Sequence, residues 1–369
     1  MFGNFFKSFG DNKGDSVLGI DIGAASIKVV QLRRRKGKAV LETYGELALG
    51  PYAGIEIGRA TKLPAEKIVE ALGDVLKEAN VTTMDSALCI PMRSSMVSLI
   101  KMPEMERKQM EQMIPIEARK YIPVPISEVT LDWFVIPEIS SAEDNKEKPE
   151  GEQNLVEILV VAIHNDVLNT YASIVTGSQL QASFFEIEMF SAIRATLEHG
   201  DNAPVMIFDM GAGATKLYIV ERGIVRDSHM VNRGSQDITI NISKAMNVSM
   251  DVAEKLKRNH GRNSEVQDQN IAKIADLVLS PLFSEANSVL LNYQRKYNKN
   301  VAKVIMVGGG VLLHGVIEQA GERFGIETVP GDPFSRVETP AFLQEVLKKT
   351  GFAFSGAIGL ALRKLQEME

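Results

Sequence analysis

Two segments half a chain apart share one arrangement of residues. In each, an aspartate follows an apolar stretch, a glycine stands two positions later, and a lysine stands seven positions after the aspartate. The first segment spans residues 21–28, and the second spans residues 209–216 in a chain of 369 residues. Each lies between two β-branched stretches, so each is predicted to be the turn of a hairpin. A repeat at half the chain length predicts two related lobes.

Strand and helix patterns alternate along the whole chain. Alternating and β-branched stretches predict strands over residues 16–22, 26–32, 39–47, 87–90, 96–101, 129–136, 155–163, 182–187, 205–209, 215–220, 224–231 and 301–307. Apolar positions at helical spacing predict helices over residues 64–80, 105–121, 165–179, 188–199, 271–297, 311–324 and 352–366, with two more before residue 271. This alternation predicts α/β lobes and excludes an all-α or all-β fold.

Charge and composition exclude several classes of function. The chain has 41 Lys and Arg against 47 Asp and Glu, a formal net charge of −6, whereas sequence-independent nucleic-acid binding needs a basic surface. One cysteine and five scattered histidines exclude a disulfide framework and a structural zinc site. The longest apolar run, residues 158–163, is far shorter than the roughly 20 residues of a membrane helix. We therefore expect a cytoplasmic protein without nucleic-acid partners.

Three further segments have unusual composition. Residues 138–154 contain six acids, two lysines and almost nothing apolar, so they are expected to be a disordered connection at a hairpin tip inside a small α+β unit. The basic run over residues 33–38 fits either a solvated hairpin tip or a surface facing anionic lipid. Six of the 16 methionines lie within 22 residues, which fits either a surface that repacks around peptides or an irregular core; they are Met92, Met96, Met102, Met105, Met110 and Met113.

The two predicted turns have the chemistry of a phosphate site. Small residues let backbone amides approach an anion closely, and the turns supply Gly23, Ala24, Ala25, Gly211, Ala212 and Gly213. An aspartate at a strand end suits a Mg²⁺ ion held through water, because Mg²⁺ keeps most of its hydration shell. Asp21 and Asp209 are therefore candidate metal-binding residues. Lys28 is expected to reach the terminal phosphates as a point charge.

Two other segments are candidates for the nucleoside. Gly308, Gly309 and Gly310 follow a predicted strand, and glycines there allow the backbone to approach a flat ring or a ribose. Glu254 and Lys257 lie three positions apart on a predicted helix, so both point from one face. A carboxylate there can accept hydrogen bonds from ribose hydroxyls while the lysine stem covers a base. Taken alone, the same pair is more typical of a solvated helix face.

Together these segments resemble the actin-like ATPase superfamily, in which two duplicated, ribonuclease H-like lobes hold a nucleotide between them. Residues 19–28 are similar to its first phosphate loop and residues 209–215 to its second, which adds Ser26 and Thr215 as phosphate contacts. Residues 308–310 resemble the adenosine loop, and residues 253–257 the ribose-contacting helix. Residues 234–239 resemble the segment after the second hairpin and add Gly234. Glu188 resembles the acid that orients the attacking water, and residues 356–361 resemble the second connecting helix.

Within the superfamily, a small α+β unit over residues 85–186 lies where the FtsA and PilM families carry subdomain IC. The sequence Glu-Ala-Arg-Lys-Tyr-Ile-Pro-Val-Pro at 117–125 and the residues at 128–132 are similar to the PilM family of type IV pilus proteins. FtsA-like chains end in a basic linker and an amphipathic helix. The present sequence shows neither pattern after its last predicted helix, so the resemblance to PilM is favoured over that to FtsA. The resemblance implies subdomain IA over 16–84, 187–203 and 340–369, IC over 85–186, IIA over 204–235 and 301–339, and IIB over 236–300.

The resemblance also implies a function. It implies an ATP- and Mg²⁺-binding assembly protein that binds the N-terminal cytoplasmic peptide of PilN and stays peripheral to the inner membrane through such partners. Contacts with pilus motor ATPases and self-association belong to the same expectation. Glu188 is then the catalytic candidate, and the activity is at most that of a slow ATPase. Two alternatives remain open: an FtsA-like division filament protein and a small-molecule kinase on the same fold.

Overall fold

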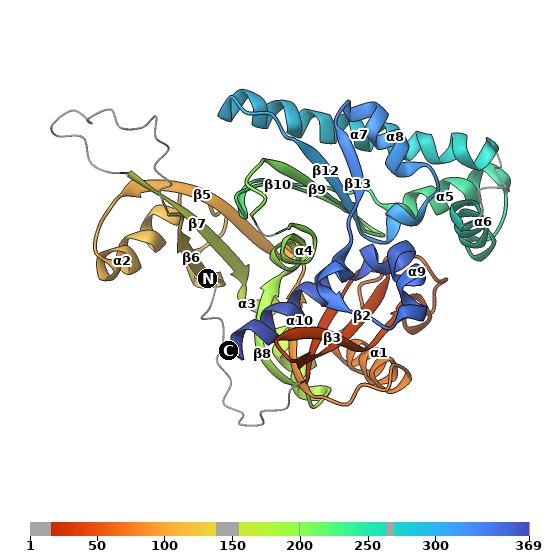
Figure 1. Cartoon of the computed structure of the whole chain (residues 1–369), viewed down its shortest axis with the longest axis horizontal. Helices are drawn as coiled ribbons and strands as arrows, with labels where there is room; N and C mark the ends of the chain where they lie inside the picture. The colour runs from red at the N-terminus through yellow and green to blue at the C-terminus, as the bar shows by residue number, and fades with distance from the viewer. Residues whose placement is uncertain (1–15, 138–154, 199, 263–268, 369) are drawn as a thin grey trace. The chain divides into compact units, whose positions relative to one another are not determined.

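The computed structural model describes residues 16–137, 155–198, 200–262 and 269–368 (Figure 1). The chain divides into two compact units, one comprising Met92–Ser173 and the other Ser8–Pro91 with Ile174–Glu369, each over its described part. We call them unit 1 and unit 2. Residues 138–154, expected to be a disordered connection, lie outside the described residues.

The first sheet of unit 2 has six strands in the order β14-β3-β2-β1-β4-β8. Its strands are β1 (Ser16–Ile22), β2 (Ser26–Arg35), β3 (Lys38–Ala48), β4 (Asp85–Ile90), β8 (Gln181–Ile187) and β14 (Val337–Glu338). The helices that accompany it are α1 (Ala65–Glu78), α4 (Glu188–Thr196), α9 (Ala341–Thr350) and α10 (Ser355–Glu367). We call this sheet with its helices lobe I.

The second sheet of unit 2 has five strands in the order β11-β10-β9-β12-β13. Its strands are β9 (Val205–Met210), β10 (Thr215–Glu221), β11 (Ile224–Val231), β12 (Lys303–Val307) and β13 (Glu327–Pro330). Its helices are α5 (Ser235–Met246), α6 (Met250–Arg262), α7 (Gln269–Tyr297) and α8 (Val316–Phe324). We call this sheet with its helices lobe II.

The two sheets repeat one topology, which confirms the predicted duplication. In each sheet, three consecutive strands pair antiparallel and two later strands extend the sheet in parallel on the other side. The repeated aspartates and lysines occupy equivalent registers, because Asp21 stands opposite Lys28 and Asp209 stands opposite Lys216. The predicted α/β, actin-like fold with duplicated lobes is therefore correct.

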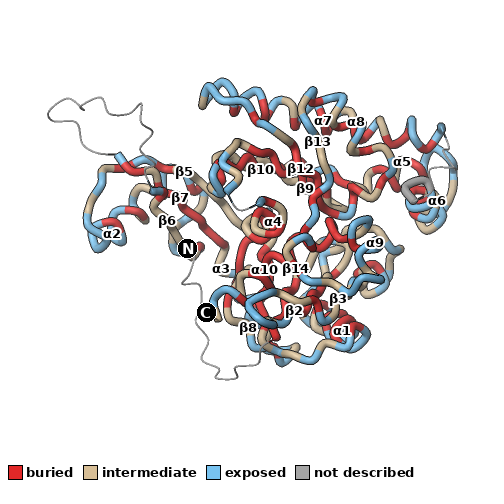
Figure 2. The backbone as a smooth tube through the Cα atoms, viewed as in Figure 1, coloured by how far each residue is buried: buried red, intermediate tan, exposed pale blue. Residues whose placement is uncertain are grey.

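Two helices, α4 and α10, pack closely in lobe I and are among the most buried segments (Figure 2). Glycines make this packing tight. A Cβ on Gly19 of β1 would collide with the backbone oxygen of Ala357 in α10, and one on Gly359 of α10 would collide with that of Ser191 in α4. These backbone contacts fix α10 between the sheet and α4.

Unit 1 is built on a three-stranded antiparallel sheet in the order β5-β7-β6. Its elements are β5 (Ser95–Pro103), α2 (Arg107–Ala118), β6 (Val129–Val135) and β7 (Leu155–His164), and α3 (Asn165–Gly177) leads from it into unit 2. Met102 and Met110 are buried in its core, and Met96 and Met105 pack against that core. Most of the methionine cluster therefore fills an irregular core, although Met113 is exposed.

The structure corrects several predicted elements. The helix predicted over residues 311–324 begins later, as α8, because Gly315 adopts a left-handed conformation (φ 74°) just before Val316. The helix predicted from residue 352 begins at Ser355 after a 3-10 turn. The sequence prediction also lacked α9, β13 and β14. The 3-10 helices are η1 (Gly50–Ala53), η2 (Met92–Ser94), η3 (Ile126–Glu128), η4 (Gly309–Leu312), η5 (Pro333–Arg336) and η6 (Gly351–Phe354).

One helix within the described ranges, α7, is long and apolar enough to span a membrane by length and composition alone. It contains Pro281, and its apolar window is 44% buried inside the protein. Phe283 of α7 stacks in a tilted arrangement on Phe208 of β9 and edge-on against Phe324 of α8. These contacts are those of a core helix of lobe II.

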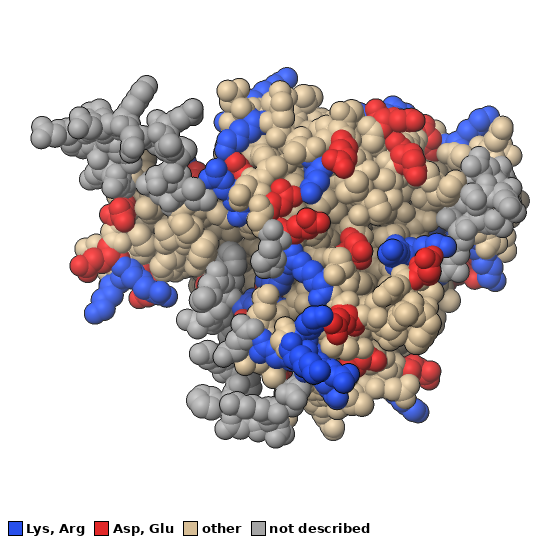
Figure 3. Space-filling view, in the orientation of Figure 1, with Lys and Arg blue, Asp and Glu red and all other residues tan. Residues whose placement is uncertain are grey.

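The basic run at the β2–β3 hairpin is partly neutralised. Arg33 pairs with Glu42 at 2.7 Å, and Lys38 pairs with Glu338 at 2.5 Å. Figure 3 shows Lys and Arg side chains gathered over the part of unit 2 that holds β2, β3 and α10, with acidic side chains among them. The mixed charges favour a solvated hairpin tip over a surface for anionic lipid.

Candidate functional site

The two duplicated hairpin turns have the same backbone geometry. The N–H of Gly23 donates to the carbonyl of Ser26 at 3.0 Å, and the N–H of Gly211 donates to the carbonyl of Ala214 at the same distance. A side chain on either glycine would press on the accepting carbonyl, at 3.0 Å in the first turn and 2.9 Å in the second. The first glycine of each turn is therefore required by the turn itself.

The structure brings the two turns together. A Cβ on Gly213 would lie 3.1 Å from the Cβ of Ala60 and 3.9 Å from the Cβ of Ala24. Residue 60 belongs to the loop between η1 and α1, which is tied to the first turn because Thr61 donates its N–H to the carbonyl of Ala24 at 2.8 Å. The predicted phosphate-binding turns of both lobes thus lie next to each other, as the duplication requires.

Lys28 of the first hairpin is held close to its own turn. Its Nζ donates to Ser26 Oγ at 2.7 Å and lies 3.2 Å from Glu46 Oε1. The ammonium group is mostly buried, with 12% of the side chain exposed. Lys28 is therefore placed beside the predicted phosphate contacts Gly23–Ser26.

Lys216, the counterpart of Lys28 in the second hairpin, joins two of the predicted acids. Its Nζ lies 2.8 Å from Glu188 Oε2 at the start of α4 and 3.2 Å from Asp209 Oδ2 on β9. Burial is the largest influence and lowers the pKa of Lys216, but the charges of Asp209 and Glu188 outweigh it and raise this pKa well above its usual range. Lys216 was absent from the predicted site, although the repeat had already marked it as the equivalent of Lys28.

Asp21 is the acid of the first hairpin and has a perturbed pKa. Burial, with smaller effects from the nearby Glu188 and Asp209 carboxylates, raises its pKa to about 6, while Lys28 and Lys216 act in the opposite direction. Its carboxylate lies against α10, since a Cβ on Gly356 would stand 2.9 Å from Asp21 Oδ2. The structure thus gathers Asp21, Asp209 and Glu188 with two lysines in one charged cluster.

We expect Asp21→Asn to raise the melting temperature of the unliganded protein more at about pH 8 than at about pH 5. The folded-state pKa of Asp21 lies above the ordinary value, so the protonated acid stabilises the fold at low pH. This contribution is lost as the pH rises through about 6. Asparagine does not titrate and keeps the neutral form. Thermal unfolding between pH 5 and pH 8 measures the difference in melting temperature between the variant and the wild type. Asp166→Asn, on the exposed start of α3, is the control. A difference for Asp21→Asn that does not change with pH would contradict the raised pKa of Asp21.

Gly234, predicted to follow the second hairpin, packs directly over it. A side chain at residue 234 would collide with the carbonyl oxygens of Gly211 and Ala212. The first turn of α5 is fastened to the same hairpin, because Ser235 and Gln236 donate their N–H groups to these carbonyls at 2.9 and 3.0 Å. Thr215, another predicted phosphate contact, uses its hydroxyl to bond the carbonyl of Arg233 at 2.8 Å. In this structure Thr215 therefore joins the hairpin to the segment that precedes α5.

The predicted ribose contacts form a buried polar cluster on α6. Glu254 accepts from Thr239 Oγ1 at 2.7 Å and pairs with Lys257 and Arg258, both at 2.7 Å. Lys257 Nζ also donates to Thr239 Oγ1 at 2.8 Å. The two residues share one helix face, as predicted, and their charges are satisfied within the protein.

A loop of lobe I crosses onto this cluster. Gly58 has a left-handed conformation (φ 91°), and a Cβ there would lie 2.5 Å from Cδ of Glu254. Two residues later, Ala60 donates its N–H to the side-chain oxygen of Gln236 at 2.9 Å. We call residues 58–60 the strap, because they join lobe I to α5 and α6 of lobe II. The strap was not predicted from the sequence, although Gly58 was a visible signal for an unusual backbone.

The glycine run after β12 packs against the second hairpin. Gly308 is left-handed (φ 89°), and a side chain there would meet Asp209 Oδ1 at 2.5 Å. Gly310 packs equally tightly on Met210, whereas a side chain on Gly309 would point into open space. Gly308 and Gly310 are thus fixed by packing, and Gly309 is the member of the run whose backbone an incoming group can approach.

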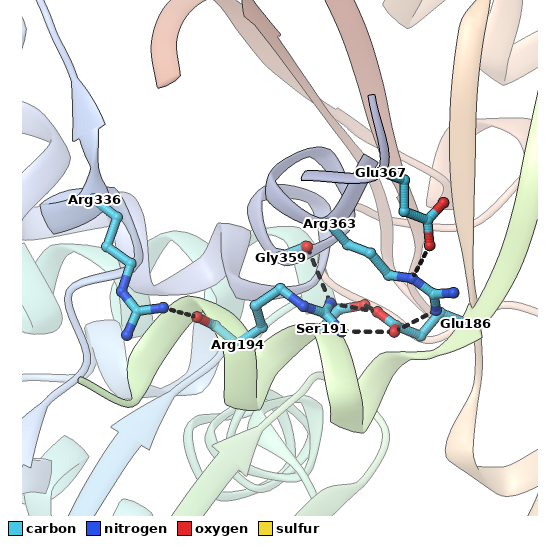
Figure 4. A network of polar contacts seen from close by, with 7 residues as sticks. All are labelled: Glu186, Ser191, Arg194, Arg336, Gly359, Arg363 and Glu367. Carbon is cyan, nitrogen blue, oxygen red and sulfur yellow. Dashed lines mark hydrogen bonds and ion pairs between the residues drawn. The ribbon is translucent and has the colours of Figure 1, made fainter. Parts of the chain in front are cut away.

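Glu186 lies two residues before Glu188 but has different partners. Figure 4 shows that Glu186 belongs to a separate network joining β8, α4 and α10. Its carboxylate accepts from Arg194 at 2.7 and 2.8 Å, from Arg363 at 2.8 Å and from Ser191 at 2.5 Å. The pKa of Glu186 is lowered because these partners outweigh its burial, which alone would raise it. The network fixes the helix that carries Glu188, so the contribution of Glu186 to the site is structural.

The chain is similar in sequence to FtsA cell division proteins. FtsA of Streptococcus pneumoniae is 21% identical over 339 residues, covering 84% of this chain and 73% of the relative. FtsA of Neisseria meningitidis is 22% identical over 333 residues, covering 80% of both chains.

Solved structures show the same fold. The PilM–PilN type IV pilus biogenesis complex has a TM-score of 0.79 at 22% identity, covering 95% of this chain and 98% of that one. MreB of Spiroplasma citri bound to AMPPNP has a TM-score of 0.54 at 11% identity, covering 97% of this chain and 98% of that one. A sequence profile of the type IV pilus assembly protein PilM matches residues 19–365. The chain therefore belongs to the PilM family of type IV pilus assembly proteins.

Proposed function

We propose that this protein is a nucleotide-binding adaptor of type IV pilus assembly that binds the N-terminal cytoplasmic peptide of PilN. The observation that carries the proposal is the family match over residues 19–365, supported by the two equivalent hairpins that face each other in unit 2. The protein would act at the inner membrane through PilN and not through a membrane span of its own. Contacts with pilus motor ATPases, self-association and the four predicted subdomains belong to the same proposal.

The proposed nucleotide is ATP, which lies between the lobes. The turn residues and Lys28 would hold the phosphates, and the nucleoside would lie near Gly309 and the Glu254–Lys257 pair. Support comes from the convergence of these residues and from the bound AMPPNP of the MreB structure with the same fold.

The carboxylates suit a Mg²⁺ ion held through water better than one bound directly. Within the described ranges, no three acidic, histidine or cysteine side chains are grouped so as to hold a metal ion. Asp209 Oδ2 is already 3.2 Å from Lys216, whereas the partly buried Asp21 faces the same cluster. Asp21 and Asp209 would therefore contact the ion's water shell, and the ion would neutralise phosphate charge when bound. Glu188, held 2.8 Å from Lys216, would orient water poorly, which fits slow hydrolysis at most.

The proposed peptide site is an apolar pocket in unit 1. Its lining is contributed by β5, the end of α2 and β7, and consists of Met96, Ser98, Ile100, Ala118, Tyr121, Ile122, Val160 and Ala162. Tyr121 and Ile122 belong to the segment whose sequence is similar to the PilM family. The pocket is closed in this structure and leaves no room for a water molecule. An apolar anchor of a short peptide would enter it only after its walls move apart, which the flexible side chain of Met96 favours.

We expect Ser98→Phe to weaken binding of a synthetic PilN N-terminal peptide by about tenfold or more, because the aromatic ring fills the pocket where an anchor side chain would lie. Fluorescence anisotropy with a labelled peptide measures the dissociation constant. Met113→Ser, on the exposed side of α2, is the matched control and should leave the affinity unchanged. Equal affinity of all three proteins would exclude this pocket, and no binding to the wild type would exclude the adaptor function.

A second candidate function is favoured by the FtsA relatives, which cover most of this chain. An FtsA-like protein would form filaments, so electron microscopy of the protein with ATP distinguishes the two. Filaments without peptide binding would favour the division protein, and peptide binding without filaments would favour the adaptor.

A further inference from the structure

Lys216 forms ion pairs with acidic residues of both lobes. It extends from β10 of lobe II and reaches Glu188, the first residue of α4 in lobe I, at 2.8 Å. On its own lobe it is 3.2 Å from Asp209, the residue directly opposite in the hairpin. The side chain is 16% exposed, and those of Glu188 and Asp209 are slightly more buried, at 14% and 12%. A buried ammonium group with these two partners is fixed in position.

Two lysines offset part of the negative charge around this position before any ion binds. Asp21, Asp209 and Glu188 supply three negative charges, and Lys28 and Lys216 supply two positive ones. Lys28 shares its charge with Glu46 at the protein surface, so Lys216 is the lysine that faces the acids of both lobes. In sites without such a residue, a divalent ion supplies the positive charge between carboxylates and phosphates.

We propose that Lys216 is a resident cation that replaces much of the charge of Mg²⁺, so that this protein binds nucleoside triphosphates with little dependence on divalent ions. The inference rests on the proposed nucleotide binding and specifies the cation requirement of that same site. The same contact holds Glu188 in an ion pair, away from the role of a general base. The site would then be suited to holding a nucleotide for long periods.

Isothermal titration calorimetry with ATP, in Mg²⁺ and then in EDTA, tests this proposal on the wild-type protein. We expect the dissociation constant to change by less than about threefold on metal removal. For Lys216→Met, which keeps the length of the side chain but not its charge, we expect a loss of about tenfold or more in EDTA and a smaller loss in Mg²⁺. Lys216→Arg keeps the charge and should resemble the wild type.

Two further measurements separate charge from structure. Tyr218→Phe is the neutral control, because Tyr218 follows two positions later on the same face of β10 and its buried hydroxyl has no hydrogen-bond partner in the described part of the chain. It should leave the metal dependence unchanged. Electron paramagnetic resonance with Mn²⁺ alone should detect an ion bound to Lys216→Met but not to the wild type, because the substitution removes the positive charge next to Glu188 and Asp209.

The outcomes are distinct. Wild-type binding that is lost in EDTA would overturn the inference and leave the proposed nucleotide function intact. No binding of ATP in either buffer would overturn both. Should Lys216→Met fail to fold, as judged by circular dichroism, the wild-type comparison still decides.

Discussion

Replacing Glu186 with alanine is expected to lower the free energy of unfolding by about 3–5 kcal/mol, the cost of removing one partner from a buried charge cluster. The Glu186 side chain is 2% exposed and is the common acceptor for Arg194 of α4 and Arg363 of α10. Without it, two guanidinium groups remain close together in the interior, one of them stacked 4.0 Å from the ring centre of Phe184. Their mutual repulsion would separate the two helices.

Urea denaturation of Glu186→Ala measures this cost. The matched control is Glu367→Gln, which removes the other carboxylate that pairs with Arg363, at 2.8 Å, but from a side chain that is 44% exposed. Exposed ion pairs contribute about 0–1 kcal/mol, so the control should be nearly neutral. Equal effects of the two substitutions would show that the network is a surface feature and not a buried anchor.

Adding one methyl group at residue 359 is expected to have the second largest effect. In Gly359→Ala, the new Cβ collides with the backbone oxygen of Ser191, so α4 and α10 must move apart at a cost of about 1–3 kcal/mol or more. The carbonyl of Gly359 also accepts a hydrogen bond from Arg194 at 3.1 Å, which this movement would lengthen. The substitution therefore weakens the same helix pair by a steric route.

The control for this substitution is another helical glycine. Gly73 lies in α1, and a methyl group added there would have no neighbouring atom within 4 Å beyond its own stretch of helix. Gly73→Ala should therefore stabilise the protein by about 0.5–1 kcal/mol through helix propensity. Thermal and urea unfolding of the two variants should give opposite signs. A stabilising effect of Gly359→Ala would mean that the two helices do not pack as closely as described.

Local patterns in the sequence predicted much of the fold. The repeat predicted the equivalent hairpins, and the register of Asp21 with Lys28 follows directly from the seven-residue spacing between them. Elements with weak local signals were missed: β14 has two residues, and α9 exposes Phe342 to 80%, so its apolar pattern does not mark a core-facing helix. Helix α8 begins later than its apolar pattern indicates because a single glycine, Gly315, turns the backbone left-handed just before it.

The site was harder to predict wherever its contacts are distant in sequence. Arg363 lies 177 residues from Glu186, and Gln236 lies 176 residues from Ala60. No spacing rule relates such pairs, because they meet only when elements distant in the chain pack together. For Lys216, the repeat was enough to predict the position opposite Asp209. Its other partner, Glu188, lies in the other lobe, and only folding brings the two residues together.

The strap has a kinetic consequence. Gly58 packs on Glu254 and Ala60 bonds Gln236, so lobe I separates from α5 and α6 only after both contacts break. The residence time of the proposed nucleotide between the lobes would then be governed by the opening rate of the strap. A bound nucleotide would persist through many encounters with partner proteins, and the protein would change state when the strap opens and the nucleotide exchanges.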